Sequence, residues 1–375
     1  MSAPDTKVME RARRAACVAA KHAAAVDLDE RFPYEGHAAL KAEGLLGLSV
    51  PGEYGGLDCD ARTAVAVVEE VAAACASTAA LLLTWAGPAG ALAAYGTKVQ
   101  KNRYLPAIAS GDCALSFALT EDHCGSDAGA IRATATRAGD DWVLEGRKAW
   151  IGNAINADLT LVAVKTDPAQ RSRGVTTFLV DKGTAGVRVE EMYSKMGARG
   201  TRHGDLRLEA ARVPATQVLG EVGRGLPQML HSLDYIRLLT AAHALGIARA
   251  AHDSAVTYAS ERETFGQKLF THQAIGFSIA DCATWIHAAR LITVDAATRL
   301  DKGEDIGAAA AMAKLHASET ATRVAHAAIQ VHGAWGLLKG NVAERAYRDA
   351  RVTEIWDGTS EIQRLIITRS IFGRG

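Results

Sequence analysis

The chain has 375 residues, more than one hydrophobic core usually accommodates, so we expect two or three packed subregions. Its 42 Lys and Arg residues balance 42 Asp and Glu residues without a polybasic block, which argues against nucleic acid as a partner. The six cysteines show no CxxC spacing, which argues against a metal site or a disulfide scaffold and is typical of the reducing cytoplasm, where we expect the protein to act.

The first part of the chain is predicted to be helical. Residues 10–27 are basic and rich in alanine, but Lys21 and His22 interrupt the run before an apolar stretch reaches ~18 residues. We interpret this run as a first helix, with a transit peptide as the alternative, and expect no membrane insertion. Helical composition continues to about residue 110, because Ala and Leu dominate and Gly and Pro fall mostly at segment ends.

The middle of the chain has a different pattern, in which short β-rich runs are separated by turn signals. These runs lie at residues 141–151, 158–165, 175–181 and 204–214. They predict a mainly β middle domain over residues 112–220, after an N-terminal helical domain over residues 1–111.

Helical periodicity returns in the last part of the chain. Apolar residues recur there at spacings of four, three and four, which is one buried helix face: Ile275, Ile279, Cys282 and Ile286. We therefore predict a C-terminal helical domain over residues 221–375. Helices, then strands, then helices again define an α+β arrangement in segregated blocks.

The informative motifs lie outside the common catalytic signatures, since no Walker loop, GxGxxG turn, HExxH helix or GxSxG elbow is present. They are ALTEDHCGSD at 118–127, RKAWIGN at 147–153, SERETFGQK at 260–268, QVHGAWG at 330–336 and AYRDARVTEIWDGTSEIQR at 346–364. Together, and in this order, they resemble the acyl-CoA dehydrogenase family, and the resemblance runs through most of the chain.

The resemblance implies an FAD-dependent enzyme with an N-terminal helical domain, a middle β-domain and a C-terminal four-helix bundle. FAD would lie between the sheet and the bundle. Thr120, in the ALTE strand, would contact the pyrimidine side of the flavin ring, and Trp150 would pack on the flavin. The full set expected on this side of the cofactor is Phe117, Leu119, Thr120, Gly125, Ser126, Trp150 and Gly152.

A second set of cofactor contacts includes one residue that would act across a subunit interface. Arg262 matches a family arginine that reaches the pyrophosphate of a neighbouring subunit's FAD, where a planar guanidinium meets two phosphate oxygens. The resemblance therefore implies a homodimer or homotetramer. It also implies cofactor contacts at Phe265, Gln273, Gln330 and Gly333, and contacts with the adenosine half of FAD or its phosphates at Thr359 and Glu361. From the residues alone, the alternative for these positions is helix packing or a solvated polar face.

The same resemblance implies residues for substrate and catalysis. Ser126, Asp234 and Arg237 would face the pantetheine and nucleotide parts of a CoA thioester. Asp357 would be the base that removes the α-proton while the β-hydrogen leaves as hydride to flavin N5. Local sequence alone also allows Asp357 to be a turn residue or a helix cap.

Two departures from the family concern the reacting centre. Asp357 stands where the family usually has Glu, so the carboxylate is withdrawn by about 1.5 Å, and a misplacement of about 1 Å can cost ~10²-fold in rate. Some subfamilies carry the glutamate base on the helix that contains LDYIR (residues 233–237), and that position in this chain is Ile236. Gly152 stands where most relatives have Thr or Ser, whose hydroxyl contacts flavin N5.

We therefore predict FAD-dependent α,β-dehydrogenation of an acyl thioester, with electrons passing to an electron-transfer flavoprotein or another acceptor. The alternatives are oxidation of an acyl group on a carrier protein in a biosynthetic pathway, an oxidase-like reaction with oxygen, and a catalytically impaired flavin-binding homologue. No metal ion is expected.

Overall fold

The computed structural model describes residues 3–191 and 194–373. The N-terminal part is helical, and its first helix begins after Asp5, whose carboxylate caps the backbone N–H groups of Lys7 and Val8. The helices are α1 (Thr6–Leu28), α2 (Tyr34–Ala42), α3 (Ala61–Ala74), α4 (Ala76–Tyr95) and α5 (Lys98–Ala109), with the short 3-10 helices η1 (Leu45–Gly47) and η2 (Gly52–Tyr54) between α2 and α3.

Helix α4 is the central helix of this part. It is apolar around its whole circumference, which is typical of a helix buried on all sides. Among the described residues, it is the one helix long and apolar enough to cross a membrane by length and composition, and 83% of that stretch is buried inside the protein. Its apolar surface is therefore covered by the core that it shares with α3 and α6.

The middle part forms an eight-stranded sheet within the described residues. The strand order is β6-β7-β3-β2-β4-β5-β8, with β1 paired to β4 in parallel. The strands are β1 (Leu115–Ala118), β2 (Thr134–Ala138), β3 (Asp141–Gly152), β4 (Leu159–Lys165), β5 (Val175–Asp181), β6 (Val187–Glu191), β7 (His203–Pro214) and β8 (Val218–Leu219). All four predicted β-rich runs are strands, and the strands that sequence reasoning missed are short.

The C-terminal part is a bundle of long helices. It consists of α6 (Gly225–Glu261), α7 (Gln273–Asp301), α8 (Gly307–His332), α9 (Val342–Thr353) and α10 (Ser360–Phe372). A two-stranded hairpin, β9 (Glu263–Thr264) and β10 (Gln267–Lys268), joins α6 to α7, and η7 (Gly333–Leu337) follows α8. Cys282 and Ile286 of the predicted face are buried, and Ile275 and Ile279 are partly buried.

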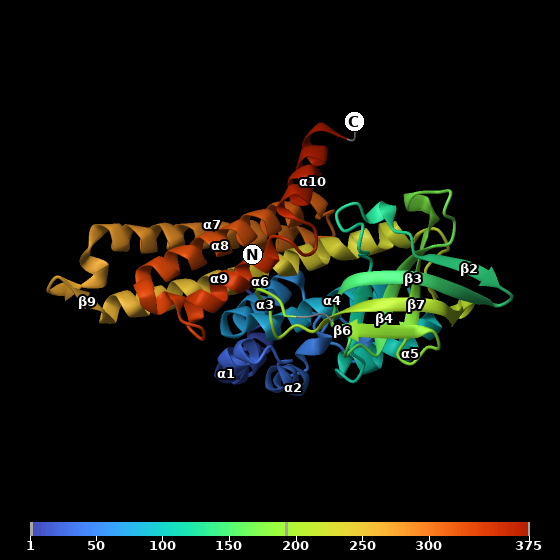
Figure 1. Ribbon diagram of the computed structural model, residues 1–375, viewed down its shortest axis with the longest axis horizontal. Coiled ribbons are helices and arrows are strands. Elements are labelled where there is room, and N and C mark those ends of the chain that lie inside the picture. The colour runs from blue at the N-terminus through green and yellow to red at the C-terminus, as the bar shows by residue number, and fades with distance from the viewer. Residues whose placement is uncertain (1–2, 192–193, 374–375) are drawn as a thin grey trace.

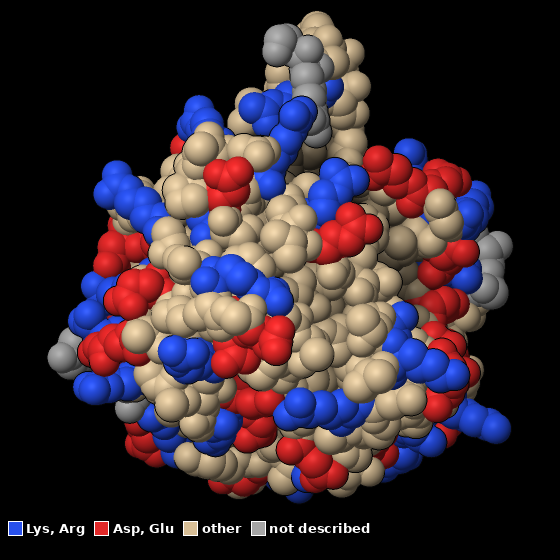
Figure 2. Space-filling view, turned by 90° about the vertical axis from the view of Figure 1, so that its right-hand side faces the viewer, with Lys and Arg blue, Asp and Glu red and all other residues tan. Residues whose placement is uncertain are grey.

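The arrangement places the sheet and the hairpin at opposite ends of the molecule (Figure 1). Helix α6 runs from the sheet to β9, the N-terminal helices pack below the bundle, and α10 projects away from it. On the face at the sheet end, basic and acidic side chains are interspersed, so this face carries no continuous field of one sign (Figure 2). The fold is the predicted α+β fold of helices, sheet and bundle.

Candidate active site

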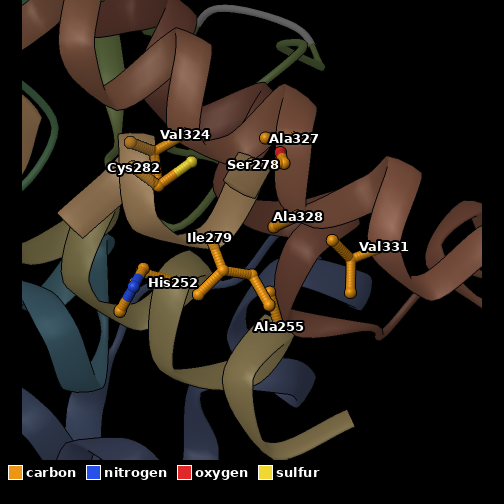
Figure 3. Close-up of a pocket in the computed structure, with 9 residues that line it drawn as sticks. All are labelled: His252, Ala255, Ser278, Ile279, Cys282, Val324, Ala327, Ala328 and Val331. Carbon is orange, nitrogen blue, oxygen red and sulfur yellow. The ribbon is translucent and has the colours of Figure 1, made fainter. Parts of the chain in front are cut away.

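A pocket of about 840 Å³ lies where the sheet meets α4, α6 and the turn between α9 and α10. Its volume lies within the roughly 300–1,000 Å³ typical of ligand sites. A second cavity, of about 10 Å³, lies inside the bundle, where His252, Ser278 and Cys282 stand among apolar side chains (Figure 3). That cavity has room for about one water molecule, so the large pocket is the candidate active site.

The large pocket brings together many of the residues that the motifs singled out. From the sheet side it is lined by Phe117, Leu119, Thr120, Gly125, Ser126, Trp150 and Gly152, and from the helical side by Arg237, Asp357 and Thr359. Residues far apart in the sequence thus share one cavity at the junction between the sheet and the bundle.

The backbone around Thr120 differs from the prediction. The resemblance predicts Thr120 in a strand, but β1 ends at Ala118. Buried Lys148 donates to the carbonyl oxygen of Leu119 at 3.1 Å and to Glu121 Oε1 at 2.7 Å, so it holds the residues on both sides of Thr120. These contacts, with the bond from Ala149 N to Thr120 O, replace the ladder pairing and leave Thr120 at the pocket wall.

Trp150 reaches the pocket through an irregularity in β3. The register between β3 and β7 shifts between Lys148 and Ile151, and Trp150 has a positive φ of 58°. Such a bulge turns a side chain out of the regular alternation. Asp205 Oδ1 accepts a hydrogen bond from the backbone N–H of Trp150 at 3.2 Å and holds this conformation. The indole is therefore 58% exposed although it belongs to a central strand.

Two glycines leave space in the pocket wall for a bound group. A Cβ added to Gly125 would meet only Thr120 Cγ2 at 3.9 Å. At Gly152 it would meet Thr84 Cγ2 at 3.7 Å and His203 Nε2 at 3.8 Å, which are ordinary contact distances. Together with the pocket volume, this open wall next to Trp150 fits a flat, aromatic cofactor ring.

Asp357 lies in the turn between α9 and α10 and faces the pocket. Its φ is +55°, a left-handed conformation that Asp tolerates better than most residues. The alternative that Asp357 is a helix cap is wrong, because Thr359 is the N-cap of α10 and accepts the N–H of Ile362. The carboxylate of Asp357 is thus free of the capping role.

Polar side chains from two helices hold this turn. Thr240 of α6 donates its hydroxyl to Asp357 Oδ2 at 2.8 Å, and Arg237 Nε donates to the Asp357 carbonyl oxygen at 3.1 Å. From α8, buried Lys314 donates to the Gly358 carbonyl oxygen at 2.8 Å. The turn is therefore fixed through both its backbone and its carboxylate.

Burial raises the pKa of Asp357 above its ordinary value, while the Thr240 hydrogen bond and the charges of Lys314 and Arg237 act in the opposite direction. Burial also lowers the pKa of Lys314 to about 8, against the effect of Asp357. The group is a carboxylate with a raised pKa beside a cavity, which is the combination expected of a general base.

The remaining predicted residues do not reach this pocket within one chain. Arg262, Phe265, Gln273, Gln330 and Gly333 lie at the hairpin end of the bundle and are exposed. This is the end remote from the sheet (Figure 1).

Two further predicted residues lie near the pocket without lining it. Glu361 is exposed in the first turn of α10. Asp234 accepts a hydrogen bond from Arg237 at 2.5 Å, so it positions a residue of the pocket. Arg237 itself is buried.

Sequence reasoning missed Lys148, Thr240, His203 and Lys314. Thr240 lies three residues after Arg237 on α6, so helical spacing places both on one face. His203 lines the pocket beside Gly152, and burial lowers its pKa to about 4. Lys148 lies inside the RKAWIGN motif and Lys314 in an apolar run, but neither is predicted to be buried, because a lysine normally extends its charged end to solvent.

A group of potential metal ligands lies beside the pocket. Glu121, His123 and Cys124 have ligand atoms within 4.8 Å of one another. Both carboxylate oxygens of Glu121 already accept hydrogen bonds, from Lys148 and from the backbone N–H groups of Arg132 and Ala133. The ion pair with Lys148 satisfies this carboxylate, and we assign no metal to it.

Comparison with known proteins identifies the family. Three acyl-CoA dehydrogenase domains match the chain: the N-terminal domain at residues 5–112, the middle domain at 116–211 and the C-terminal domain at 223–372. The chain therefore belongs to the acyl-CoA dehydrogenase family. It is a flavin-type oxidoreductase that acts on CH–CH bonds.

Individual relatives agree with this assignment. The chain is 42% identical to the mitochondrial short-chain specific acyl-CoA dehydrogenase of Bos taurus over 92% of this chain and 84% of that protein. Butyryl-CoA dehydrogenase from Megasphaera elsdenii has a TM-score of 0.96 at 31% identity, covering 99% of both chains. The prolyl acyl carrier protein oxidase AnaB has a TM-score of 0.94 at 28% identity, covering 99% of this chain and 100% of that chain.

Proposed function

We propose that the protein is an FAD-dependent dehydrogenase that introduces a Cα=Cβ double bond into an acyl thioester. The observation that carries this proposal is the Asp357 carboxylate, which lines the same cavity as Thr120 and Trp150. A base and a cofactor wall must share one cavity if a proton and a hydride are to leave neighbouring carbons of one substrate.

The residues of this chain that would hold FAD are Thr120, Ser126 and Trp150 at the pocket. Bound FAD would supply the acceptor for the β-hydride. Arg262 and its neighbours at the hairpin end would contact the FAD of another subunit, which is why we propose a homodimer or homotetramer. Their exposure in the single chain supports this assignment, because guanidinium and aromatic groups at such a surface are available to a partner.

Asp357 would remove the α-proton of the substrate. The C–H bond breaks, the proton moves to the carboxylate, and the electron pair forms the double bond as the β-hydrogen leaves. Burial, which raises the pKa of Asp357, makes the carboxylate more basic and so favours this transfer. Arg237, beside the same turn, would face the pantetheine or nucleotide part of the CoA thioester.

The acyl group could be carried by CoA or by a carrier protein. Relatives named for CoA thioesters favour CoA, whereas similarity to the prolyl acyl carrier protein oxidase favours a carrier protein and reaction with oxygen. We propose CoA as the carrier and an electron-transfer flavoprotein as the acceptor. The free state of the cysteines supports a reducing, cytoplasmic location.

The visible spectrum of the purified protein, before and after anaerobic addition of acyl-CoA thioesters, tests the proposal. We expect bound FAD that is bleached by at least one acyl-CoA. Bleaching only by acyl carrier protein thioesters would transfer the function to the second candidate, and rapid turnover with oxygen alone would indicate an oxidase. A protein that cannot retain FAD would contradict both.

The Asp357→Asn variant tests the base. The change is nearly isosteric, so FAD content should remain, while the rate of bleaching falls by ~10²-fold or more. Unchanged bleaching would show that another group takes the proton.

A further inference from the structure

Thr240, which lies outside all the motifs, contacts the carboxylate of the proposed base. Thr240 is fully buried on α6, and its hydroxyl donates to Asp357 Oδ2 at 2.8 Å. The two residues are separated by 117 positions in the sequence. A buried hydroxyl with a carboxylate partner is a specific contact, because an unpaired polar group would be costly there.

The position of Thr240 on α6 directs its hydroxyl toward the turn. Thr240 follows Ile236 by four residues and Arg237 by three, so it lies next to both of them on the helix surface. Ile236 and Arg237 both line the pocket. The face that carries Thr240 is therefore the face of α6 that borders the reacting centre.

We propose that Thr240 is a positioning residue for the base: its hydroxyl holds Oδ2 of Asp357 and leaves Oδ1 to accept the substrate proton. This inference rests on the proposed function, in which Asp357 is the base. The hydrogen bond fixes the rotation of a short carboxylate whose backbone is already held by Arg237. It also favours the ionised form, because a hydroxyl donates more strongly to a carboxylate than to a carboxylic acid.

Charged side chains from several helices surround Asp357. Lys314 on α8 and Arg237 on α6 favour the carboxylate. The titratable and charged groups around this cluster are Lys314, Arg237, Asp234, His243, Glu354 and Glu361. Thr240 differs from all of them, since it is neutral and contacts the carboxylate itself.

The test is the pH dependence of anaerobic flavin bleaching in Thr240→Val, which removes the hydroxyl and keeps the shape. The base must be ionised, so a higher pKa of Asp357 moves the acid limb of the rate profile to higher pH. We expect a shift of about one to two pH units, because a hydrogen bond to a charged group corresponds to roughly that change in pKa. Thr240→Ser keeps the hydroxyl and should have the same pH profile as the wild type.

Thr293→Val is the matched control. Thr293 is also fully buried on a bundle helix, but its hydroxyl donates to the carbonyl oxygen of Ala289 at 2.8 Å. We expect no shift of the acid limb in this variant. Should Thr240→Val fail to fold, Thr240→Cys provides a side chain of similar size with a weak donor, and a smaller shift in the same direction is expected.

Infrared titration of the protein gives a readout independent of turnover. The band of the protonated Asp357 carboxyl is identified by its loss in Asp357→Asn, and its pKa should rise in Thr240→Val by the same amount as the acid limb. An unchanged pKa and profile, faster bleaching without the hydroxyl, or an equal shift in Thr293→Val would each overturn the role of Thr240. Full activity of Asp357→Asn would instead overturn the proposed function.

Discussion

The proposed cofactor contacts fall into two regions that are built in opposite ways. At the sheet end, Thr120, Trp150 and Asp357 are held by buried polar partners and line one cavity within a single chain. At the hairpin end, Arg262 and Phe265 are exposed, and Phe265 is 97% exposed. The difference teaches that the first region is assembled by the folding of one chain, whereas the second, under the proposed function, would contact FAD only across a subunit interface.

The two regions also differ in how far they depart from the family. The sheet end carries the changes that we singled out, Asp357 and Gly152, while the hairpin end keeps the RETFG and QVHG segments that carry the resemblance. Cofactor retention and assembly should therefore follow the family, and the rate and pH dependence of the reaction should be particular to this chain.

At the sheet end, we expect the largest change in the bleaching rate for Asp357→Glu. Restoring the family's residue adds a methylene, so the carboxylate no longer fits the Thr240 hydroxyl at 2.8 Å and extends into the pocket. We expect the rate of anaerobic bleaching to fall by about 10- to 10²-fold, since misplacement by about 1 Å can cost that much. A rate above wild type would show instead that the aspartate is a weakened base. The hydrogen bond from Thr240 would then not make up for the shorter side chain of Asp357.

The hairpin end is tested by Arg262→Ala. Loss of a bidentate contact with a phosphate should weaken FAD binding by about 10- to 10²-fold. Arg262→Lys should be intermediate, because it keeps the charge and loses the planar fork. Flavin content after gel filtration, with the molar mass measured by light scattering, checks both variants.

Arg299→Ala is the control for this experiment. Arg299 is an exposed arginine near the opposite end of α7, where it pairs with Asp295 on the surface. Such a pair contributes little, so FAD content should not change. A wild-type protein that is monomeric and retains FAD, or an Arg262→Ala variant with full flavin content, would contradict the division of the site between two chains.

The contrast also explains what the sequence could predict. The strands at 141–151, 158–165, 175–181 and 204–214 follow from local alternation and turn residues, which act over a few positions. The contact of Thr240 with Asp357 spans 117 positions, and that of Lys314 with Gly358 spans 44. No local pattern encodes either of them, so they became visible only when α6, α8 and the turn were placed together.

A similar reason accounts for the misplaced end of β1. Leu119 and the β-branched Thr120 follow Ala118, and their composition alone predicts more strand. Buried Lys148, 29 positions away from Leu119, withdraws the backbone from the ladder. A buried lysine is rare enough that sequence reasoning assigns it to the surface, and this assignment hides its effect on the site.

The buried polar contacts of the sheet end predict a pH dependence of stability. Asp349 on α9 accepts the N–H of Ala198, which lines the pocket, at 2.7 Å. Burial raises the pKa of Asp349 to about 6. Because the folded pKa exceeds the unfolded value, the contribution of this group is fully present below about pH 4 and is lost as pH rises through about 6.

Asp349→Asn should therefore raise the free energy of unfolding at pH 8 by about 1–3 kcal/mol, with the gain shrinking toward pH 5. The amide keeps an oxygen acceptor for Ala198 N and stays neutral. Denaturant unfolding at both pH values measures the difference. Lower stability of the variant at pH 8 would mean that the neighbouring arginines keep Asp349 ionised in the folded protein.

The smallest expected effect belongs to Gly152→Ser, which returns a hydroxyl to the pocket wall. A Cβ fits there at ordinary contact distances, so the variant should fold normally. A new hydrogen bond to the flavin would be worth about 0.5–1.5 kcal/mol, and we expect a two- to tenfold faster bleaching. Gly152→Ala adds the same Cβ without the hydroxyl and should leave the rate unchanged.

His203 decides how this last result is interpreted. It pairs with Gly152 across β3 and β7, and its Nε2 would lie 3.8 Å from the new Cβ. With its pKa lowered to about 4, His203 is neutral at pH 7 and can accept a hydrogen bond from the serine hydroxyl. Equal rates for Gly152→Ser and Gly152→Ala would then indicate that the serine hydroxyl donates to His203 and not to the flavin. In Gly152→Ser combined with His203→Phe, this acceptor is absent, so the hydroxyl should donate to the flavin and the bleaching rate should rise.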